Sequence, residues 1–224
     1  MDLILIALAP ICVVIIYIYF KDKYEKEPKR LLVLNFLLGA IVSIIITTII
    51  YYVFDFILPL PNHTSILQQF IKAFLVVGFT EEFSKYIIVR YVAQNYKAFN
   101  EPLDGIVYAV MVSMGFAATE NIFYVLEGGY ATALARAFTA IPAHATFGIL
   151  MGYFMGKAKF SNNRISLNLT GLFLAILFHG SYDFFLFIDF VPGIWIGAIV
   201  SLIVGIILSL KAIKRHQKNS QFKQ

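Results

Sequence analysis

The stretch GFTEEFSKYIIVR, residues 78–90, places three ionisable side chains inside an apolar run. AFLVV precedes it and YIIV lies within it, a composition typical of a segment that lies in lipid. Each charge at the centre of a bilayer costs roughly 2.5–3.5 kcal/mol on insertion scales. Glu81, Glu82 and Lys85 therefore need a structural or a chemical reason to lie there.

The composition of the chain is that of an integral membrane protein. Its 224 residues are 60% hydrophobic and 14% charged, whereas soluble domains average about 45–50% apolar and about 25% charged residues. Apolar runs near the ~20 residues that a spanning helix needs cover most of the length. We therefore expect a single transmembrane domain, residues 1–224, with an all-α fold built as a polytopic helical bundle.

Turn-like linkers divide the apolar sequence into seven predicted spanning helices. The linkers are rich in Gly, Pro, Asn and charged residues, as in KDKYEKEPKR after the first run and EGGY after the fourth. The first run lacks the basic start and small-residue cleavage site of a signal peptide, so we interpret it as a retained span. The predicted spans cover about residues 3–20, 32–54, 66–91, 104–126, 131–156, 167–188 and 191–210.

The basic residues predict the orientation of the bundle. Four segments carry 15 of the 18 Lys and Arg residues: those after the first, third, fifth and seventh spans. The positive-inside rule places these segments in the cytoplasm, so the N-terminus is predicted outside and the C-terminus inside. Because the net charge of +5 gathers at span ends, it does not indicate a nucleic-acid partner. Cys12 is the only cysteine, which excludes an intrachain disulfide or a cysteine-ligated metal site.

Ionisable side chains remain inside four of the predicted spans. Polar groups of this kind usually face a bundle interior or a water-filled cavity. His179 and Asp183 are spaced i, i+4 on one helical face, and Lys85 lies i+4 from Glu81 and i+3 from Glu82, so it can neutralise one of them. The full set is Glu81, Glu82 and Lys85 in the third span, Glu120 in the fourth, Arg136 and His144 in the fifth, and His179 and Asp183 in the sixth.

A simpler interpretation exists for each of these residues alone. Glu82 and Lys85 can form a structural ion pair, Glu120 with Asn121 can hold helices together, and Arg136 can extend its charge to the interface. Pro142 lacks a backbone donor and is expected to open the helix just before His144. Glycines at 148, 152 and 156 predict a face on which another helix packs closely. What these interpretations leave unexplained is the similar depth of EE, His and HxxxD on three helices, estimated at 1.5 Å per residue.

Two kinds of chemistry fit this set of side chains. In one, a carboxylate acts as general base on water and the imidazoles orient the water and stabilise an oxyanion. In the other, histidine and carboxylate ligands hold a zinc ion whose bound water is the nucleophile. Both are typical of amide hydrolysis, and residue types alone do not choose between them.

Four motifs in this order resemble the PrsW family of bacterial intramembrane proteases. They are TEEFSKY, FAATENIFY, PAHATFG with the following MGYFMG, and FHGSYDF, all within residues 78–188, and the KDKYEKEPKR linker extends the likeness. The family is related to the type II CAAX prenyl proteases and the bacteriocin self-immunity proteins. The resemblance implies a multi-pass protein of the bacterial cell membrane that makes the site-1 cut in a single-span anti-sigma factor and so leads to release of a stress-response sigma factor.

The resemblance also implies roles for individual residues. Glu81 and Glu82 would be the catalytic pair, with Glu81 and His144 activating water, and His179 with residue 183 would stabilise the oxyanion. Lys85, Glu120 and Asn121 would support them. The CAAX enzymes commonly carry Asn where this chain has Asp183, so this acid would have to be protonated, orient His179, or bind metal. A zinc ion, if one is bound, would be held by Glu81, His144, His179 and Asp183.

Other functions use similar residues. A small transporter or proton pathway also needs carboxylates at mid-membrane, although the inverted repeats common in transporters are missing from this sequence. A non-catalytic membrane protein could use the polar cluster to fix helix register. A CAAX-type or bacteriocin-processing protease would share the chemistry and differ in substrate.

Overall fold

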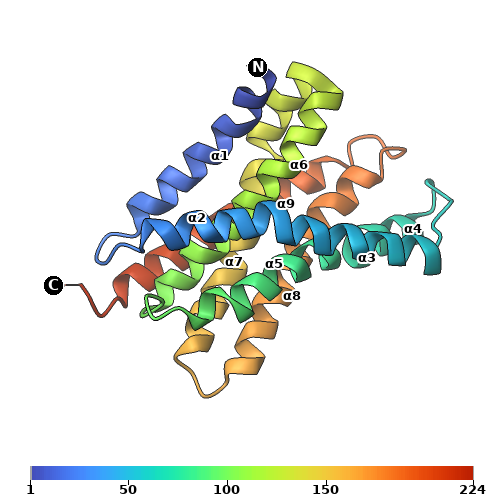
Figure 1. Cartoon of the computed structure of the whole chain (residues 1–224). Helices are drawn as coiled ribbons and strands as arrows, with labels where there is room; N and C mark the ends of the chain where they lie inside the picture. The colour runs from blue at the N-terminus through green and yellow to red at the C-terminus, as the bar shows by residue number, and fades with distance from the viewer. Residues whose placement is uncertain (1, 224) are drawn as a thin grey trace.

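The computed structural model describes residues 2–223, and every regular element in this range is a helix. Figure 1 shows the helices packed as a bundle, with segments distant in sequence lying across one another. In chain order they are α1 (Asp2–Lys21), α2 (Lys29–Leu37), η1 (Leu38–Ser43), α3 (Ile44–Ile57), α4 (Ile66–Ile71), η2 (Lys72–Phe79), α5 (Thr80–Tyr91), η3 (Ala93–Asn95), α6 (Pro102–Phe138), α7 (Ala140–Lys159), α8 (Arg164–Phe187) and α9 (Ile196–Lys218).

The predicted all-α membrane fold is confirmed, and the exact number of spans stays a prediction. Among the described residues, five helical stretches are long and apolar enough to cross a membrane: Leu3–Lys21, Lys29–Ile57, Pro102–Lys159, Arg164–Phe187 and Ile196–Lys218. The 58-residue stretch contains two of the seven predicted spans. The segment 66–91 is a continuous helix but carries five charged residues, so its composition alone does not mark it as a span.

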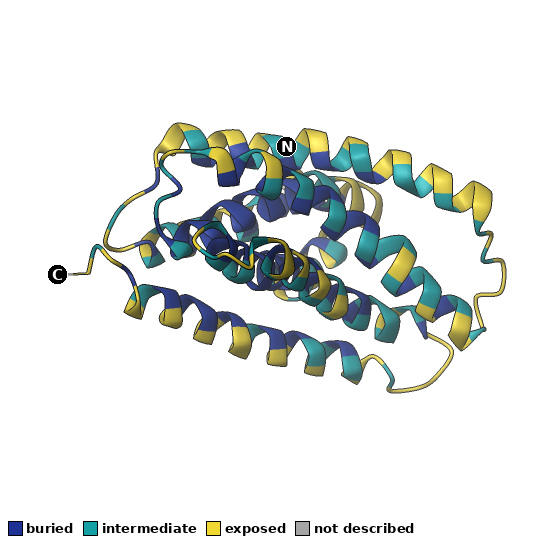
Figure 2. Cartoon of the chain, turned by 90° about the horizontal axis from the view of Figure 1, so that it is seen from below, coloured by how far each residue is buried: buried dark blue, intermediate teal, exposed yellow. Residues whose placement is uncertain are grey.

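The outer surface of the bundle is largely apolar. Figure 2 shows buried residues gathered along the central helices and exposed residues along the outer ones. Many exposed side chains are large and apolar, such as Phe56 at 88% and Ile165 at 73% exposure. An apolar outer surface of this extent fits a hydrocarbon environment. The buried core runs along α6 and α7.

A helical hairpin forms the centre of the bundle. α6 reverses at Gly129, whose φ of +69° is a left-handed conformation that glycine adopts readily, and this lies in the predicted EGGY turn. The returning helix is interrupted at Thr139 (φ −122°, ψ −77°), three residues before Pro142, where the break was predicted. Pro142 instead lies in the first turn of α7, where an amide hydrogen has no helical partner to lose.

The glycine face on α7 brings the two arms of this hairpin together. A Cβ atom on Gly152 would lie 2.3 Å from the Gly105 carbonyl oxygen, and one on Gly156 would lie 2.0 Å from the Pro102 carbonyl oxygen. Such contacts leave no room for a side chain, so the backbones of α6 and α7 touch directly. The predicted close approach of another helix is confirmed.

Two continuous helices pass each other antiparallel beside the hairpin. One comprises α2, η1 and α3, and the other comprises α4, η2 and α5. Asn35 Nδ2 donates to the Tyr96 hydroxyl at 3.3 Å near one end, and the Thr47 hydroxyl donates to Ser84 Oγ at 2.9 Å further along. Both helices contain a π-helical segment, a feature that often occurs at functional sites.

The basic linkers meet at one end of the bundle. Lys159 Nζ donates to the Tyr96 carbonyl at 2.8 Å, and Arg164 Nη2 donates to Gln94 Oε1 at 3.2 Å. Gln221 Nε2 from the C-terminal segment donates to the Asn100 carbonyl at 3.0 Å. These contacts agree with the predicted alternation of charge between the two sides. The assignment of this end to the cytoplasm stays a prediction.

Candidate active site

The two adjacent glutamates lie in the first turn of α5, directly after the π-helical segment η2. This segment packs against the backbone of α8, because a Cβ atom on Gly78 would lie 3.2 Å from the Gly180 amide nitrogen. Gly180 follows His179 in the chain. The close crossing of two glycines therefore brings Glu82 within reach of the His179 ring.

Lys85 lies between the acidic and imidazole groups. Its Nζ atom is 2.7 Å from Glu82 Oε1, 3.5 Å from Glu81 Oε2 and 3.4 Å from His144 Nδ1. The same atom lies 4.1 Å from the centre of the Phe116 ring. The predicted i+3 and i+4 pairs are both formed, and the shorter contact neutralises Glu82. With a fully buried side chain, Glu82 is held in place by this ammonium group.

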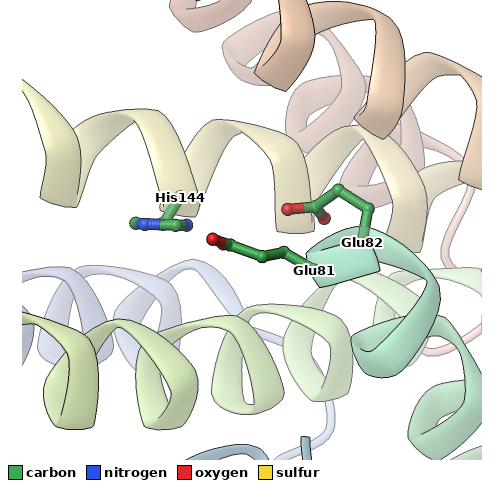
Figure 3. Close-up of side chains that lie close together, drawn as sticks. All are labelled: Glu81, Glu82 and His144. Atoms are coloured by element: carbon green, nitrogen blue, oxygen red, sulfur yellow. The ribbon is translucent and has the colours of Figure 1, made fainter. Parts of the chain in front are cut away.

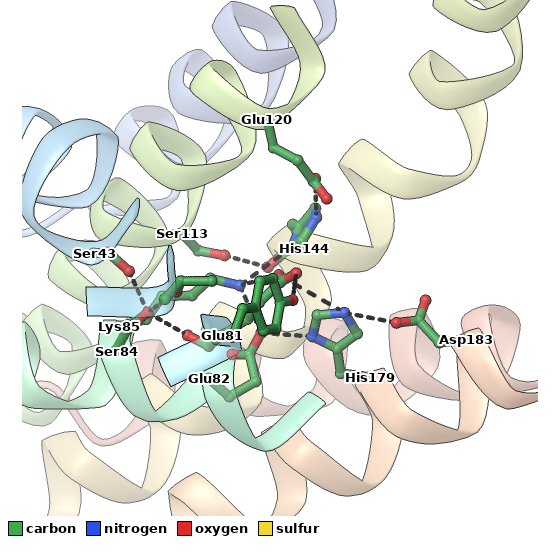
Figure 4. A network of polar contacts seen from close by, with 12 residues as sticks. Ser43, Glu81, Glu82, Ser84, Lys85, Ser113, Glu120, His144, His179 and Asp183 are labelled. Atoms are coloured by element: carbon green, nitrogen blue, oxygen red, sulfur yellow. Dashed lines mark hydrogen bonds and ion pairs between the residues drawn. The ribbon is translucent and has the colours of Figure 1, made fainter. Parts of the chain in front are cut away.

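His179 has a carboxylate at each ring nitrogen (Figure 4). Its Nδ1 lies 2.9 Å from Glu82 Oε1 and its Nε2 lies 3.2 Å from Asp183 Oδ2, which confirms the predicted i, i+4 contact. Phe147 stacks on the ring at 4.7 Å between centroids. A neutral imidazole offers one donor and one acceptor, so two carboxylate neighbours require a doubly protonated ring or a protonated acid. Asp183 thus lies where an orienting residue for His179 would have to lie, and its role stays a prediction.

Glu120 holds the other imidazole. His144 Nε2 lies 2.9 Å from Glu120 Oε2, so Nε2–H donates to the carboxylate and Nδ1 is left as an acceptor toward Lys85. Arg136 Nη2 donates to the same Glu120 oxygen at 2.8 Å, and Arg136 Nε donates to Asn121 Oδ1 at 2.7 Å. The hairpin turn places these residues opposite each other. Arg136, expected to extend to the interface, instead forms part of the site, and Glu120 is tied to His144 directly.

Tyr51 is a member of the site that sequence reasoning missed. Its hydroxyl, on α3, donates to Glu81 Oε1 at 2.9 Å. Aromatic residues in the spans were interpreted as lipid-facing, and a tyrosine within an apolar run carries no spacing signal of its own. Only the antiparallel crossing of α3 and α5 brings the hydroxyl to the carboxylate.

A cavity of about 1090 Å³ opens onto this cluster. Of the acids in the polar cluster, Glu120 and Asp183 are the more exposed, at 20% and 14% of their side chains, and their place nearer the outer face stays a prediction. Glu82 does not line the cavity, whereas Glu81 does. Part of the wall is the segment between α3 and α4, at the end opposite the basic linkers. The site residues on the wall are Tyr51, Glu81, Glu120, Arg136, His144, His179 and Asp183.

Three side chains converge closely enough to be considered as metal ligands. Glu81, Glu82 and His144 each offer one ligand atom within 4.8 Å of the others (Figure 3). One imidazole and two carboxylates suit a zinc ion by residue type, although Lys85 Nζ lies among them and would have to move aside. This trio differs from the predicted metal set. In the structure Asp183 and His179 pair with each other, and both His179 nitrogens face carboxylates.

The fold and the site together define a polytopic membrane protein with an ionisable, cavity-facing site inside its helix bundle. Comparison with known proteins identifies the family. Residues 27–219 match the family model described as "PrsW family intramembrane metalloprotease". The chain belongs to this family.

Curated relatives agree with this membership. The chain is 41% identical to Protease PrsW of Oceanobacillus iheyensis over 180 residues, covering 80% of each chain. It is 38% identical to Protease PrsW of Geobacillus kaustophilus over 186 residues, which is 83% of this chain and 80% of the relative. With Protease PrsW of Clostridioides difficile it shares 35% identity over 218 residues, 94% of this chain and 88% of the relative. No solved structure matches the chain.

The predicted class is therefore confirmed. The protein is a membrane-embedded protease and a multi-pass protein of the bacterial membrane. Membership in a protease family decides against the transporter and the non-catalytic alternatives.

Proposed function

We propose that the protein hydrolyses a peptide bond in a single-span membrane protein, with Glu81 as the general base. The observation that carries this assignment is the unequal placement of the two glutamates. Glu81 lines the cavity, whereas Glu82 is fully buried and bound by Lys85 and His179. A base must reach the water that it deprotonates. Glu82 is then a positioning residue, which holds Lys85 and His179 in place.

The geometry supports a water-activation step. A carboxylate oxygen of Glu81 and a ring nitrogen of His144 lie within 4.8 Å of each other, a separation that one hydrogen-bonded water spans. His144 can orient that water because Glu120 fixes its ring through Nε2. Glu81 takes a proton from the water while the water oxygen bonds to the scissile carbonyl carbon. The carbonyl oxygen then becomes an oxyanion.

The remaining groups support the collapse of that intermediate. His179 lines the cavity, and Glu82 holds its ring through Nδ1. The Nε2–H, which faces Asp183 Oδ2 at 3.2 Å, would have to leave that carboxylate to donate to the oxyanion. The C–N bond then breaks, and the proton held by Glu81 passes to the leaving amine. Water, proton and leaving group are all accounted for by side chains of this chain.

A metal ion is implied by the family description, and the donor set fits it by residue type. Glu81, Glu82 and His144 would hold the ion, with Lys85 displaced from its position among them. A zinc ion bound there would polarise the carbonyl and acidify a bound water. Zinc content of the purified protein and cleavage after chelation distinguish zinc-assisted hydrolysis from hydrolysis by the glutamate base alone.

The substrate we propose is a membrane-spanning anti-sigma factor that is cut at site 1. The cavity wall includes the segment between α3 and α4, at the end opposite the basic linkers. By the positive-inside rule that end faces the outside. A substrate strand entering there would be cut near the outer edge of its span, as the resemblance to the PrsW family implies.

Reconstitution tests this proposal. Purified protein is placed in liposomes with a single-span substrate that carries its soluble domain on the side of the cavity mouth. We expect a cut in or beside the outer half of the span with the wild type, and no cut with Glu81→Gln. Glu127→Gln, at an exposed position near the hairpin turn, is the matched control and should cleave normally. Equal cleavage by Glu81→Gln would refute the role of this base, and a cut only at the opposite end would refute the substrate assignment.

A further inference from the structure

A second group of buried acids lies at the end of the bundle that carries the basic linkers. Glu25 and Glu27, in the linker between α1 and α2, meet Asp104 in the first turn of α6. Each offers one carboxylate oxygen within 4.8 Å of the other two. We call these three residues the linker carboxylate cluster. They belong to the KDKYEKEPKR motif and the start of α6, which the proposed protease chemistry does not use.

Two members of the cluster are deeply buried. Glu27 is 2% exposed and Asp104 is 0% exposed. The Tyr108 hydroxyl donates to Glu27 Oε2, and the backbone amides of Asn100 and Glu101 donate to Asp104 Oδ2 at 2.7 and 2.8 Å. Among the described residues no N–H or O–H group donates to Glu27 Oε1 or Asp104 Oδ1, and the two carboxyl groups lie within hydrogen-bond reach of each other. The two carboxyl groups therefore either share a proton or face a bound cation.

No basic side chain of the described residues forms an ion pair with the cluster. Within residues 2–223, every ion pair of 4.0 Å or less lies in the protease site. Two lysines of this end of the bundle are directed elsewhere: Lys26 Nζ donates to the Tyr19 carbonyl, and Lys159 Nζ donates to the Tyr96 carbonyl at 2.8 Å. Buried carboxylates without counter-charge are strongly disfavoured.

We propose that the linker carboxylate cluster binds a divalent cation, Mg²⁺ or Ca²⁺, through Glu27, Asp104 and Glu25. These ions take oxygen ligands and commonly combine carboxylates with water. Glu25 is half-buried, so the site has an open side for water. The cation would tie the linker after α1 to the start of α6 and thus fix the outer helix α1 against the central hairpin.

A shared proton is the competing explanation. Burial, together with the neighbouring Asp104 charge, raises the pKa of the Glu27 carboxyl to about 9. Without a cation the pair would hold that proton at neutral pH. A bound cation would raise the Tm of the protein, whereas a shared proton would leave the Tm insensitive to added cation. A cation titration therefore separates the two explanations.

The experiment uses the full-length protein, purified in detergent and stripped with a chelator. Mg²⁺ and Ca²⁺ are titrated separately and the Tm is followed. We expect a saturable rise in Tm with at least one of them, because an ion that binds only the folded state stabilises it. The rise should disappear in Glu27→Gln and persist in Glu81→Gln, which places the response at the cluster rather than at the protease site.

If the Glu27→Gln variant fails to fold, Tb³⁺ binding provides a second measurement. Tb³⁺ mimics Ca²⁺, and its emission would be excited by Tyr108, whose hydroxyl contacts Glu27. Glu25→Gln leaves the buried pair intact and should weaken the affinity for Tb³⁺ about tenfold, since ligand charge sets the affinity of such sites. A wild-type Tm indifferent to both cations, or an affinity unchanged by Glu25→Gln, would overturn the proposal.

Discussion

The protein buries acidic groups in two regions, and the regions differ in how the charge is neutralised. In the protease site Glu82 has Lys85 at 2.7 Å and Glu120 has Arg136 at 2.8 Å. In the linker carboxylate cluster, Glu27 and Asp104 are also buried but have no ion-pair partner within residues 2–223. The protease site has its counter-charges within the chain, whereas the linker carboxylate cluster, on our proposal, takes its counter-charge from a bound cation.

This difference between the two regions indicates why a basic side chain of the chain itself is needed in one of them. Removing a carboxylate from water costs several kcal/mol, and a partner recovers the cost only with good geometry. A catalytic site has to keep its charges in a fixed arrangement at all times, which cations within the chain ensure. A structural site at the membrane edge can take its cation from solution, because only the folded protein needs it.

The largest expected effect separates the two glutamates of the protease site. Glu81→Gln removes the cavity-facing base and should lower kcat roughly 10²–10⁴-fold, the usual contribution of a general base. The Tm should change little, because Lys85 keeps its closer partner Glu82. Cleavage of a reconstituted single-span substrate and thermal unfolding in detergent measure the two quantities. A variant with normal kcat would show that Glu81 is not the base.

The next largest effect is on stability, and it tests whether the two regions neutralise their buried acids differently. Glu82→Gln leaves the buried Lys85 ammonium without its closest partner and should destabilise the protein by about 3–5 kcal/mol. In chelator, Glu27→Gln should be neutral or stabilising, because it removes a carboxylate that has no basic partner. Equal loss of Tm in both variants would show that the two regions are not neutralised differently.

A double variant controls for side effects of the Glu82 substitution. Lys85→Met alone leaves two glutamates without their ammonium partner, and Lys85→Met with Glu82→Gln removes both members of the closest pair. If the pair accounts for the loss, the double variant should be more stable than the sum of the single variants predicts. Strict additivity would assign the loss to packing around His179 or Phe116 instead.

Much of the site could be predicted because helical spacing is a local property. The contacts from Lys85 to Glu81 and Glu82, and from His179 to Asp183, follow from i, i+3 and i, i+4 geometry. The hairpin turn at EGGY and the glycine face of α7 also follow from short-range sequence rules. Charge and hydropathy along the chain were enough to predict a membrane bundle.

Contacts between distant segments could not be predicted in this way. The Tyr51–Glu81 bond depends on how α3 crosses α5, and the Glu120–His144 bond depends on the register of the hairpin. The linker carboxylate cluster joins Glu27 to a residue 77 positions later, Asp104, which no periodicity relates to it. Such contacts depend on how distant helices are aligned with one another, and no short-range pattern in the sequence indicates that alignment.

A moderate effect is expected where the protease site meets the hairpin. Glu120→Gln keeps the shape of the side chain but removes the charge that binds both His144 and Arg136. His144 should lose its fixed ring position, and kcat should fall about tenfold, as for partners that orient a functional imidazole. A shift in the pH–rate profile would accompany the loss if the role is positioning, whereas a purely structural role would lower the Tm without moving that profile.

The smallest effect compares the tyrosine that each region places on a carboxylate. Tyr51 donates to Glu81 beside a cavity, where water can replace the lost hydroxyl, whereas Tyr108 donates to the buried Glu27. Tyr51→Phe should therefore lower kcat only roughly 3- to 10-fold, less than the full value of one hydrogen bond to a charged group, and should leave the Tm unchanged. Tyr108→Phe is the matched variant, and it should lower the Tm measurably because Tyr108 is 0% exposed and water cannot replace the donor on that side of the cluster. Thermal unfolding and single-turnover cleavage of both variants would show the opposite pattern if the cavity were dry and the Tyr108 side of the cluster hydrated.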